Sequence, residues 1–298
     1  MNRASKSYLL TGFVILFWAT SATAFKIALS YVNPYNLLFY SSLFSTFIFL
    51  IILITQKKIP ALKRYSKKDF LHAALLGLLN PFGYYVVLFK AYDLLPGQIA
   101  MSLNYGWPIV LSVLSIPILK HTVTLKQLIS ILISFAGVVI IATKGEFISL
   151  EGLSIAGVAL ALFSTVIWAI YWLFNTKAEH DPVIKLFLGF CFGVVYTAIL
   201  SPFLGEIALP EFRAILAIAY VSLFEMGITF VLWLTALKLS ANTAKISNLI
   251  FITPFLSLLV LSIVLNEVLF ASTFIGLSLV ISGIIFQGIK KRTQKYEP

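Results

Sequence analysis

Long apolar runs separated by short polar connections are the dominant pattern of this chain. Each run has roughly 18 to 24 residues, enough for a helix to cross about 30 Å of hydrocarbon. The connections carry residues that stop helices or make turns, such as Asn33-Pro34, Pro96-Gly97 and Asp181-Pro182. The pattern therefore predicts ten membrane-spanning helices, at about 8–29, 35–55, 70–92, 97–118, 125–143, 153–175, 184–203, 214–237, 243–265 and 271–289.

Composition supports a membrane protein, because 60% of the 298 residues are hydrophobic and only 11% are charged, unlike soluble globular domains. Backbone amides inside lipid must be hydrogen-bonded within the protein, which leaves helices and closed barrels as spanning structures. The alternating ten-residue pattern of barrel strands is absent. We therefore expect an all-α integral membrane protein. Its single cysteine, Cys191, allows neither an intramolecular disulfide nor a cysteine metal site.

The positions of the basic residues predict how the chain is oriented in the membrane. The net charge is +11, but the charges lie at the ends of the apolar runs, so they indicate orientation signals and not a nucleic-acid groove. The N-terminus, the even-numbered loops and the C-terminus hold eighteen lysines and arginines, whereas the odd-numbered loops hold only Lys144 and Arg213. By the positive-inside rule both termini are predicted to be cytoplasmic.

The two halves of the chain resemble each other. A shift of 146 residues superposes Trp107-Pro108 on Thr253-Pro254. We therefore predict a first five-helix repeat at 1–146 and a second at 147–298, which together form one membrane domain. Because five is an odd number of spans, the second repeat would lie inverted in the membrane, a design typical of transporters with a midplane substrate site.

A carboxylate lies near the middle of one predicted span. Eleven residues separate Arg213 from Glu225 and twelve separate Glu225 from Lys238, which places the acid roughly 18 Å from either flanking cation. An acid at this depth costs several kcal/mol unless it faces a bundle interior or a water-filled path. The functional interpretation is a contact for a cation or amine, or a proton carrier; the structural alternative is a carboxyl group hydrogen-bonded to neighbouring residues.

Other polar and aromatic residues lie near the same depth, and these suit an amphipathic organic ligand. Lys26, in the outer part of the first span, is a candidate carboxylate contact, with snorkelling outward as the alternative. Several aromatic residues near helix ends are assigned to the interfacial belts instead. The belt residues are Tyr31, Tyr35, Tyr171, Trp172 and Trp233; the candidate substrate-binding or coupling residues are Glu225, Asn80, Tyr84, Asn104, Trp107, Trp18 and Lys26.

Helix-breaking residues at related positions are candidates for gating. Pro108 and Pro254 occupy equivalent places in the fourth and ninth spans, where a proline removes a helical hydrogen bond and permits bending. Pro81 lies opposite Gly227 when the halves are aligned, at the depth of Glu225. We expect the third span to be loosened there, which would free carbonyl groups for a ligand.

The ten spans, the duplication and the segment TPFLSLLVLSIVLNEVLFASTFIGLSLVISGIIF resemble the drug/metabolite transporter superfamily, of the EamA-like type. The resemblance implies a central cavity enclosed by spans 1, 3, 4, 6, 8 and 9, with alternating access by rocking of the halves. It also implies a multi-pass protein of a bacterial inner membrane. One difference is that the family's acid after the proline-containing helix is present as Glu267, whereas the first half has Lys120-His121.

These observations predict a secondary transporter, an exporter or exchanger of small organic metabolites, with amino acids or related amines favoured. No catalytic residues, metal site or cofactor are predicted, because the three histidines lie apart and no nucleotide-binding loop is present. The expected partners are a small-molecule substrate, the lipid bilayer and, as one alternative, protons, for a monomer or homodimer. Exchange of larger anions such as nucleotide sugars, or a membrane-embedded enzyme or receptor, are the other interpretations.

Overall fold

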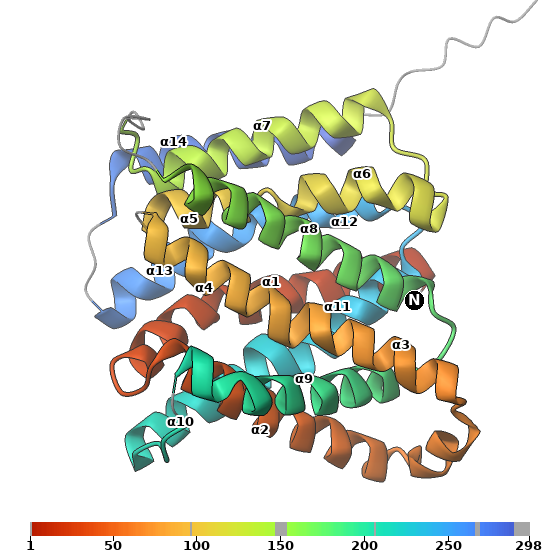
Figure 1. Ribbon diagram of the computed structural model, residues 1–298. Coiled ribbons are helices and arrows are strands. Elements are labelled where there is room, and N and C mark those ends of the chain that lie inside the picture. The colour runs from red at the N-terminus through yellow and green to blue at the C-terminus, as the bar shows by residue number, and fades with distance from the viewer. Residues whose placement is uncertain (1, 96, 147–153, 206, 266–268, 289–298) are drawn as a thin grey trace, which may run out of the picture.

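The structure is a bundle of helices that run back and forth between two ends (Figure 1). It is a computed structural model that describes residues 2–95, 97–146, 154–205, 207–265 and 269–288. All regular structure in these ranges is helical. The helices are α1 (Arg3–Leu29), α2 (Pro34–Thr55), η1 (Ile59–Arg64), α3 (Lys67–Gly77), η2 (Leu78–Gly83), α4 (Tyr84–Leu94), α5 (Gly97–Asn104), α6 (Trp107–Leu119), α7 (Leu125–Ala142), α8 (Ile155–Lys177), α9 (Pro182–Leu204), α10 (Phe212–Val221), η3 (Ser222–Gly227), α11 (Ile228–Leu239), α12 (Thr243–Leu249), η4 (Ile250–Ile252), α13 (Thr253–Leu265) and α14 (Ala271–Gly288).

The predicted all-α membrane fold is confirmed. Within the described ranges, nine helical segments are long and apolar enough to cross a membrane. The span predicted at 97–118 consists of two shorter helices, α5 and α6, with Tyr105 and Gly106 between them. The spans predicted at 70–92, 214–237 and 243–265 are also interrupted, each by a short segment of π- or 3-10-helix. The interruption of the third span was predicted from Pro81, whereas the other interruptions were not, because the apolar run continues through them.

The turn residues that bound the apolar runs act as helix caps. The side chain of Asn33 accepts a hydrogen bond from the backbone N–H of Asn36, and Pro34 follows in the first turn of α2. Asp181 and Pro182 begin α9 in the same way. A side-chain oxygen at the N-cap satisfies a backbone donor that the helix leaves unpaired, and proline is tolerated next to it. These local rules explain why the sequence predicted the connections well.

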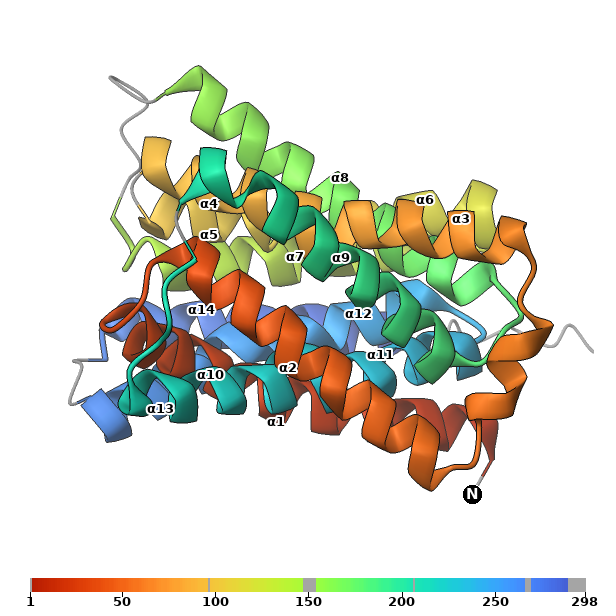
Figure 2. The same cartoon turned by 60° about the horizontal axis from the view of Figure 1, so that its bottom comes forward.

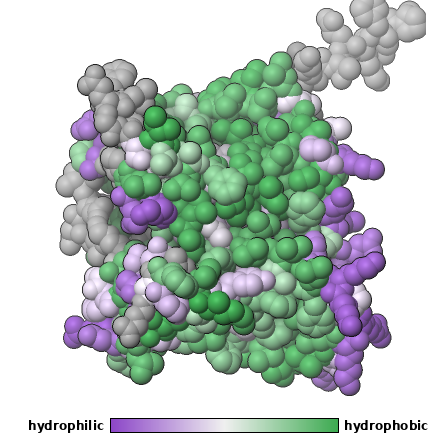
Figure 3. All heavy atoms as spheres, in the orientation of Figure 1, coloured by the Kyte–Doolittle hydropathy of each residue, from purple (hydrophilic) through white to green (hydrophobic). Residues whose placement is uncertain are grey.

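The surface matches a membrane environment. Figure 3 shows an apolar band across the middle of the molecule, with hydrophilic residues gathered at the two ends. Many large apolar side chains are exposed on the surface, among them Leu216 and Ile263 at 60% and 79% exposure. An apolar surface this extensive is typical of contact with lipid and not with water.

The helices form two layers with a helix pair on either side (Figure 2). In one layer α8 packs against α4, α5 and α6; in the other α1 packs against α10, α11 and α13. Thus the first helix of each predicted half packs against helices of the other half. The flanking pairs are α2 with α9 and α7 with α14. In the α7–α14 pair a Cβ atom added to Gly137 would come within 2.4 Å of the Gly276 carbonyl oxygen, so glycine permits the close approach.

The predicted membrane orientation can be tested because Lys63 and Glu146 lie at opposite ends of the bundle. We expect Lys63→Cys and Glu146→Cys, each on a Cys191→Ser background, to react with a membrane-impermeant thiol reagent from opposite sides. In intact cells only Glu146→Cys should be labelled, since the positive-inside rule places Lys63 in the cytoplasm. Labelling of both positions in intact cells would contradict the topology and the inverted repeat together.

Candidate functional site

A cavity of about 200 Å³ lies between the two layers. Its walls come from α1, α4, the α5–α6 segment, α8, η3 and the η4–α13 segment. These are the spans numbered 1, 3, 4, 6, 8 and 9 in the sequence, the six that the family resemblance implied. The polar residues of the lining are Ser21, Tyr84, Tyr85, Tyr92, Asn104, Tyr105, Glu225, Thr253 and Ser257.

Glu225 is held in a π-helical turn, η3, in the middle of its span. The backbone N–H of Ile228 bonds to the carbonyl of Leu223, five residues earlier. Gly227 is required here, because an added Cβ atom would come within 2.4 Å of the Ser222 carbonyl oxygen. Single π turns are frequent at functional sites, where they redirect a side chain. The role of Gly227 predicted from sequence as a gating residue is untested, but its structural role is to permit this turn.

The carboxyl group of Glu225 faces the cavity and has polar neighbours from two other helices. The Tyr85 hydroxyl donates a hydrogen bond to Glu225 Oε1 at 3.4 Å. Ser21 of α1 lies beside the same carboxyl group. Among the described side chains that line the cavity there is no lysine, arginine or histidine. The carboxyl group is therefore available to a cationic ligand or a proton.

Asn104 is part of a second polar group in the same cavity. It accepts a hydrogen bond from the Tyr84 hydroxyl at 3.2 Å and donates one from Nδ2 to Ser164 Oγ at 3.0 Å. The structure thus brings together Tyr84 and Asn104, both predicted site residues, from α4 and α5. These bonds fix the orientation of the amide. The second N–H of Nδ2 and the free lone pair of Oδ1 therefore point in defined directions.

Four tryptophans from different helices meet at one side of the cavity. The ring centroid of Trp18 lies 6.2, 6.2 and 5.9 Å from those of Trp107, Trp168 and Trp233. Trp18 and Trp107 were predicted to lie near midspan, and the structure brings them together. We call these four residues the tryptophan cluster. Their packing closes the cavity on that side.

The assignment of three aromatic residues to the interfacial belts is wrong. Tyr171, Trp172 and Trp233 are 1% exposed or less, and all three pack in the main core. Position along a span gives the depth of a residue, but it does not show whether its side chain faces lipid or protein. Trp168, which the sequence reasoning missed, lies one helical turn before Trp172, and this spacing was the available signal for an inward-facing aromatic stripe.

The residues around Asn80 are placed differently from the prediction. The backbone of Asn80 is extended inside η2 (φ −154°, ψ 129°), so the predicted interruption of the third span is present. However, Asn80 is fully buried beside Tyr171 and does not line the cavity. Pro81 packs against Gly193 of α9. Lys26 lies in α1, but its side chain is outside the described residues, as is Glu267.

The two gating prolines lie just after breaks in their spans. Pro108 is in the first turn of α6, after the interruption at Tyr105 and Gly106. Pro254 is the second residue of α13, directly after the 3-10 segment η4. A proline in a first turn removes no regular helical hydrogen bond. The interruption of each span therefore comes from the irregular segment before the proline. The expected mechanism, a proline kink inside a continuous helix, is wrong at these two positions.

A wider cavity borders the central one toward one end of the bundle. A second cavity of about 670 Å³ shares Phe25, Tyr85, Leu88 and Tyr92 with the first and extends to Asp93. Its other walls come from the end of α1 and the start of α2. The two cavities are thus neighbours, and the second lies toward the end of the bundle that carries Asp93.

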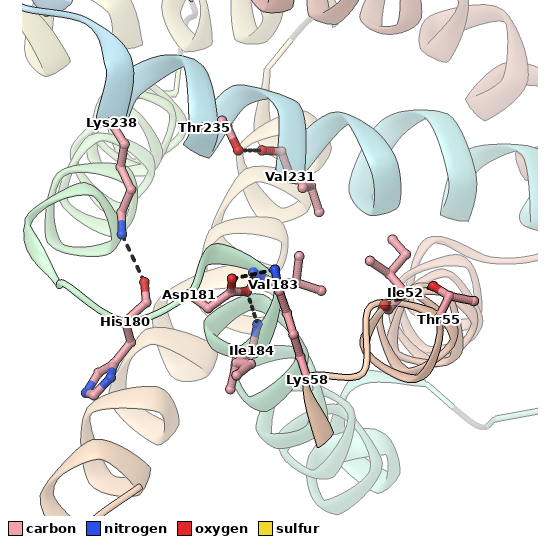
Figure 4. Close-up of polar contacts among 10 residues, drawn as sticks. All are labelled: Ile52, Thr55, Lys58, His180, Asp181, Val183, Ile184, Val231, Thr235 and Lys238. Carbon is pink, nitrogen blue, oxygen red and sulfur yellow. Dashed lines mark hydrogen bonds and ion pairs between the residues drawn. The ribbon is translucent and has the colours of Figure 1, made fainter. Parts of the chain in front are cut away.

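At the opposite end, polar contacts gather around the α8–α9 connection (Figure 4). Lys58 Nζ lies 2.6 Å from Asp181 Oδ2, and Asp69 Oδ1 lies 2.8 Å from His180 Nε2. Lys238 Nζ donates to the His180 carbonyl oxygen at 2.9 Å. We call Lys58, Asp69, His180, Asp181 and Lys238 the end cluster. It joins residues of the first predicted half to residues of the second.

An aromatic residue covers part of the end cluster. The Tyr65 ring lies 4.5 Å from the His180 ring, between centroids. Burial, together with the nearby Asp181 and Asp69 carboxylates, raises the pKa of the Tyr65 phenol above its usual range. Tyr65 therefore stays neutral and packs against His180 as an aromatic ring at any physiological pH.

The described residues include no group of three or more His, Cys, Asp or Glu side chains that could hold a metal ion. With one carboxyl group, hydroxyls, an amide and aromatic rings, the cavity is equipped to bind an organic molecule. A central cavity between two layers of a multi-pass helical membrane protein is the arrangement expected of a membrane transporter.

The comparisons with known proteins agree with this class. The model of the EamA-like transporter family matches residues 5–143 and 155–288, so the chain belongs to that family. It is 25% identical to an uncharacterized transporter of Archaeoglobus fulgidus, over 96% of this chain and 99% of that one. It is 24% and 26% identical to the uncharacterized transporters YvbV and YyaM of Bacillus subtilis, which it covers to 94% and 95%. A solved crystal structure shares the fold, with a TM-score of 0.82 and 21% identity over 95% of this chain and 96% of that one.

Proposed function

We propose that this membrane transporter is a secondary transporter, exporter or exchanger, of small organic metabolites that carry an amine, including amino acids. The observation that carries the proposal is Glu225, a carboxyl group that faces the cavity without a cationic partner among the described lining side chains. An ammonium group would supply the missing charge, and charge-assisted hydrogen bonds are the stronger class of polar contact. Membership of the family supports the transport step.

The size and lining of the cavity favour a small substrate over a nucleotide sugar. The central cavity has a volume of about 200 Å³, below the roughly 300–1,000 Å³ of pockets that hold drug-sized ligands. Tyr84, Tyr85, Trp107 and Trp168 present aromatic surface next to Glu225, which suits a cation or an apolar side chain. A diphosphate would instead require several cationic donors, and the described lining side chains include none.

The proposed mechanism is alternating access between the two layers. The proposed substrate path leads to the end that carries Asp93, where the wider cavity borders the central one, and the tryptophan cluster and the end cluster are proposed to block the other direction. Release on the second side would require these contacts to separate while the Asp93 end closes. The breaks before Pro108 and Pro254 are the proposed hinges. With both termini cytoplasmic in a bacterial inner membrane, the Asp93 end would lie on the side of the membrane away from the cytoplasm.

Thermal stabilisation across a ligand panel tests the substrate class. Purified protein should be heated with primary amines, amino acids, matched alcohols in which a hydroxyl replaces the amine, and nucleotide sugars. A ligand at about 100 times its dissociation constant adds roughly 2.7 kcal/mol to the free energy of unfolding. We expect stabilisation by at least one amine and none by its matched alcohol. Stabilisation by nucleotide sugars alone would contradict the proposal and support the larger-anion alternative.

A further inference from the structure

The indole N–H of Trp18 makes a hydrogen bond that links α1 to the π turn. Trp18 Nε1 donates to the backbone carbonyl oxygen of Glu225 at 3.2 Å. A second carbonyl of the same turn, that of Ser222, accepts a hydrogen bond from Ser45 Oγ at 3.0 Å. Side chains from α1 and α2 therefore bond to the backbone on both sides of the turn. The carboxyl-bearing residue itself is held by Trp18.

The ring of Trp18 is oriented by its neighbours in the tryptophan cluster. Because Trp107, Trp168 and Trp233 all pack around it, the direction of its N–H is fixed by packing. The indole nitrogens of Trp168 and Trp233 have no hydrogen-bond partner among the described residues. Trp18 thus differs from these two neighbours in having an acceptor for its N–H.

We propose that Trp18 is a positioning residue for Glu225: its bond to the carbonyl fixes the backbone of the π turn, which aims the carboxyl group at Tyr85 and the cavity. The proposal rests on the function proposed above for Glu225. It assigns to Trp18 a role beyond contact between its ring and a ligand. Loss of the bond would leave the carbonyl without this donor and let the turn relax, so the carboxyl group would change its surroundings.

A matched pair of substitutions separates the hydrogen bond from the packing. Trp18→Phe and Trp233→Phe each replace an indole by a phenyl ring in the same cluster. Only Trp18→Phe removes an N–H that has an acceptor. The experiment titrates the purified protein with protons. It measures the infrared difference spectrum between acid and alkaline pH. The protonated carboxyl band of Glu225 is assigned as the band that Glu225→Gln removes.

We expect Trp18→Phe to shift the frequency of this band. It should also change the proton concentration at half-titration by about two- to tenfold, the range expected for one hydrogen bond. Trp233→Phe keeps an aromatic ring beside Trp18 and leaves the Trp18 N–H in place, so it should change both quantities by much less. The titratable groups of the described side chains that face Glu225 are the phenols of Tyr84, Tyr85 and Tyr105, and both variants keep them.

Equal spectra for the Trp18 and Trp233 variants would overturn the proposal, because Trp18 would then act only through packing. If Trp18→Phe does not fold, benzothienylalanine at position 18 keeps the ring size and removes only the N–H donor, and the same shift is expected. The amine panel on the unaltered protein is independent of this spectrum. A negative panel with a shifted band would reject the proposed substrate and retain the positioning role; the reverse result would reject the positioning role alone.

Discussion

Glu225→Gln should fold and insert normally but lose transport driven by a pH gradient. Glutamine keeps the size and much of the hydrogen bonding of glutamate but cannot ionise. A bound amine favours the carboxylate and a buried site favours the neutral acid, so substrate and proton compete for Glu225. A hydrogen bond to a charged group contributes about 1.5–3 kcal/mol, so amine affinity should fall by roughly tenfold or more. Uptake or efflux in proteoliposomes, with and without an imposed pH gradient, measures both effects.

Glu146→Gln is the matched control for this experiment, because Glu146 is an exposed acid at the end of the bundle. It should leave the rate and its pH profile unchanged. The sign of the pH effect in the unaltered protein follows from the competition: amine binding weakens as the pH falls, because protons occupy the carboxylate. If Glu225→Gln transports the same amine with the same pH profile, Glu225 is structural, and the site would have to be sought around Asn104 and Lys26.

Asp181→Asn should open the end of the bundle that the end cluster is proposed to close. Asparagine is as good an N-cap as aspartate, so the bonds from Asp181 to the start of α9 can be kept while the ion pair with Lys58 is lost. A partly exposed pair contributes up to about 1 kcal/mol, which corresponds to about a fivefold change in the population of an open state. The reporter is Ser257→Cys in the cavity, on a Cys191→Ser background, labelled from each side of oriented vesicles.

Asp93→Asn is the control for the end cluster. Asp93 also pairs with a lysine, Lys90, but at 3.7 Å and with side chains 62% and 57% exposed, at the open end. We expect this substitution to leave the labelling of Ser257→Cys unchanged from both sides. Asp181→Asn should increase labelling from the closed side several-fold. Identical labelling in the two variants would mean that the tryptophan cluster alone closes this end, without help from the end cluster.

Depth in the membrane is the property that could be calculated from the sequence. Counting residues between Arg213 and Lys238 placed Glu225 at midspan, and the structure places it in the central cavity. Counting residues did not show which way the Asn80 side chain points: it lies at a similar depth, but it is buried beside Tyr171 and not in the cavity. The same counting failed for Trp233, assigned to a belt and found in the core. Depth follows from helix rise, whereas the direction of a side chain depends on how its helix is rotated against its neighbours.

The partners of Glu225 required the tertiary structure for a related reason. Tyr85 is 140 residues away from it in the chain and Trp18 is 207 residues away, and nothing in the local pattern of either run connects them. The π turn is equally hidden, because the apolar run continues through it. A signal was nevertheless present in Gly227, since the turn brings its Cα against the Ser222 carbonyl and leaves no room for a side chain.

The sequence by itself determined the class of the protein, the positions of most spans and the resemblance to a transporter family. It could do so because burial in lipid and helix capping depend on consecutive residues. Only the tertiary structure decided that α1 and α8 pack against helices of the opposite predicted half, so that the layers around the cavity are not the two halves of the chain. It also placed the wider cavity beside the central one, at the Asp93 end. Both outcomes depend on interlocking surfaces of helices distant in sequence, and such packing is a property of pairs of helices that no single run contains.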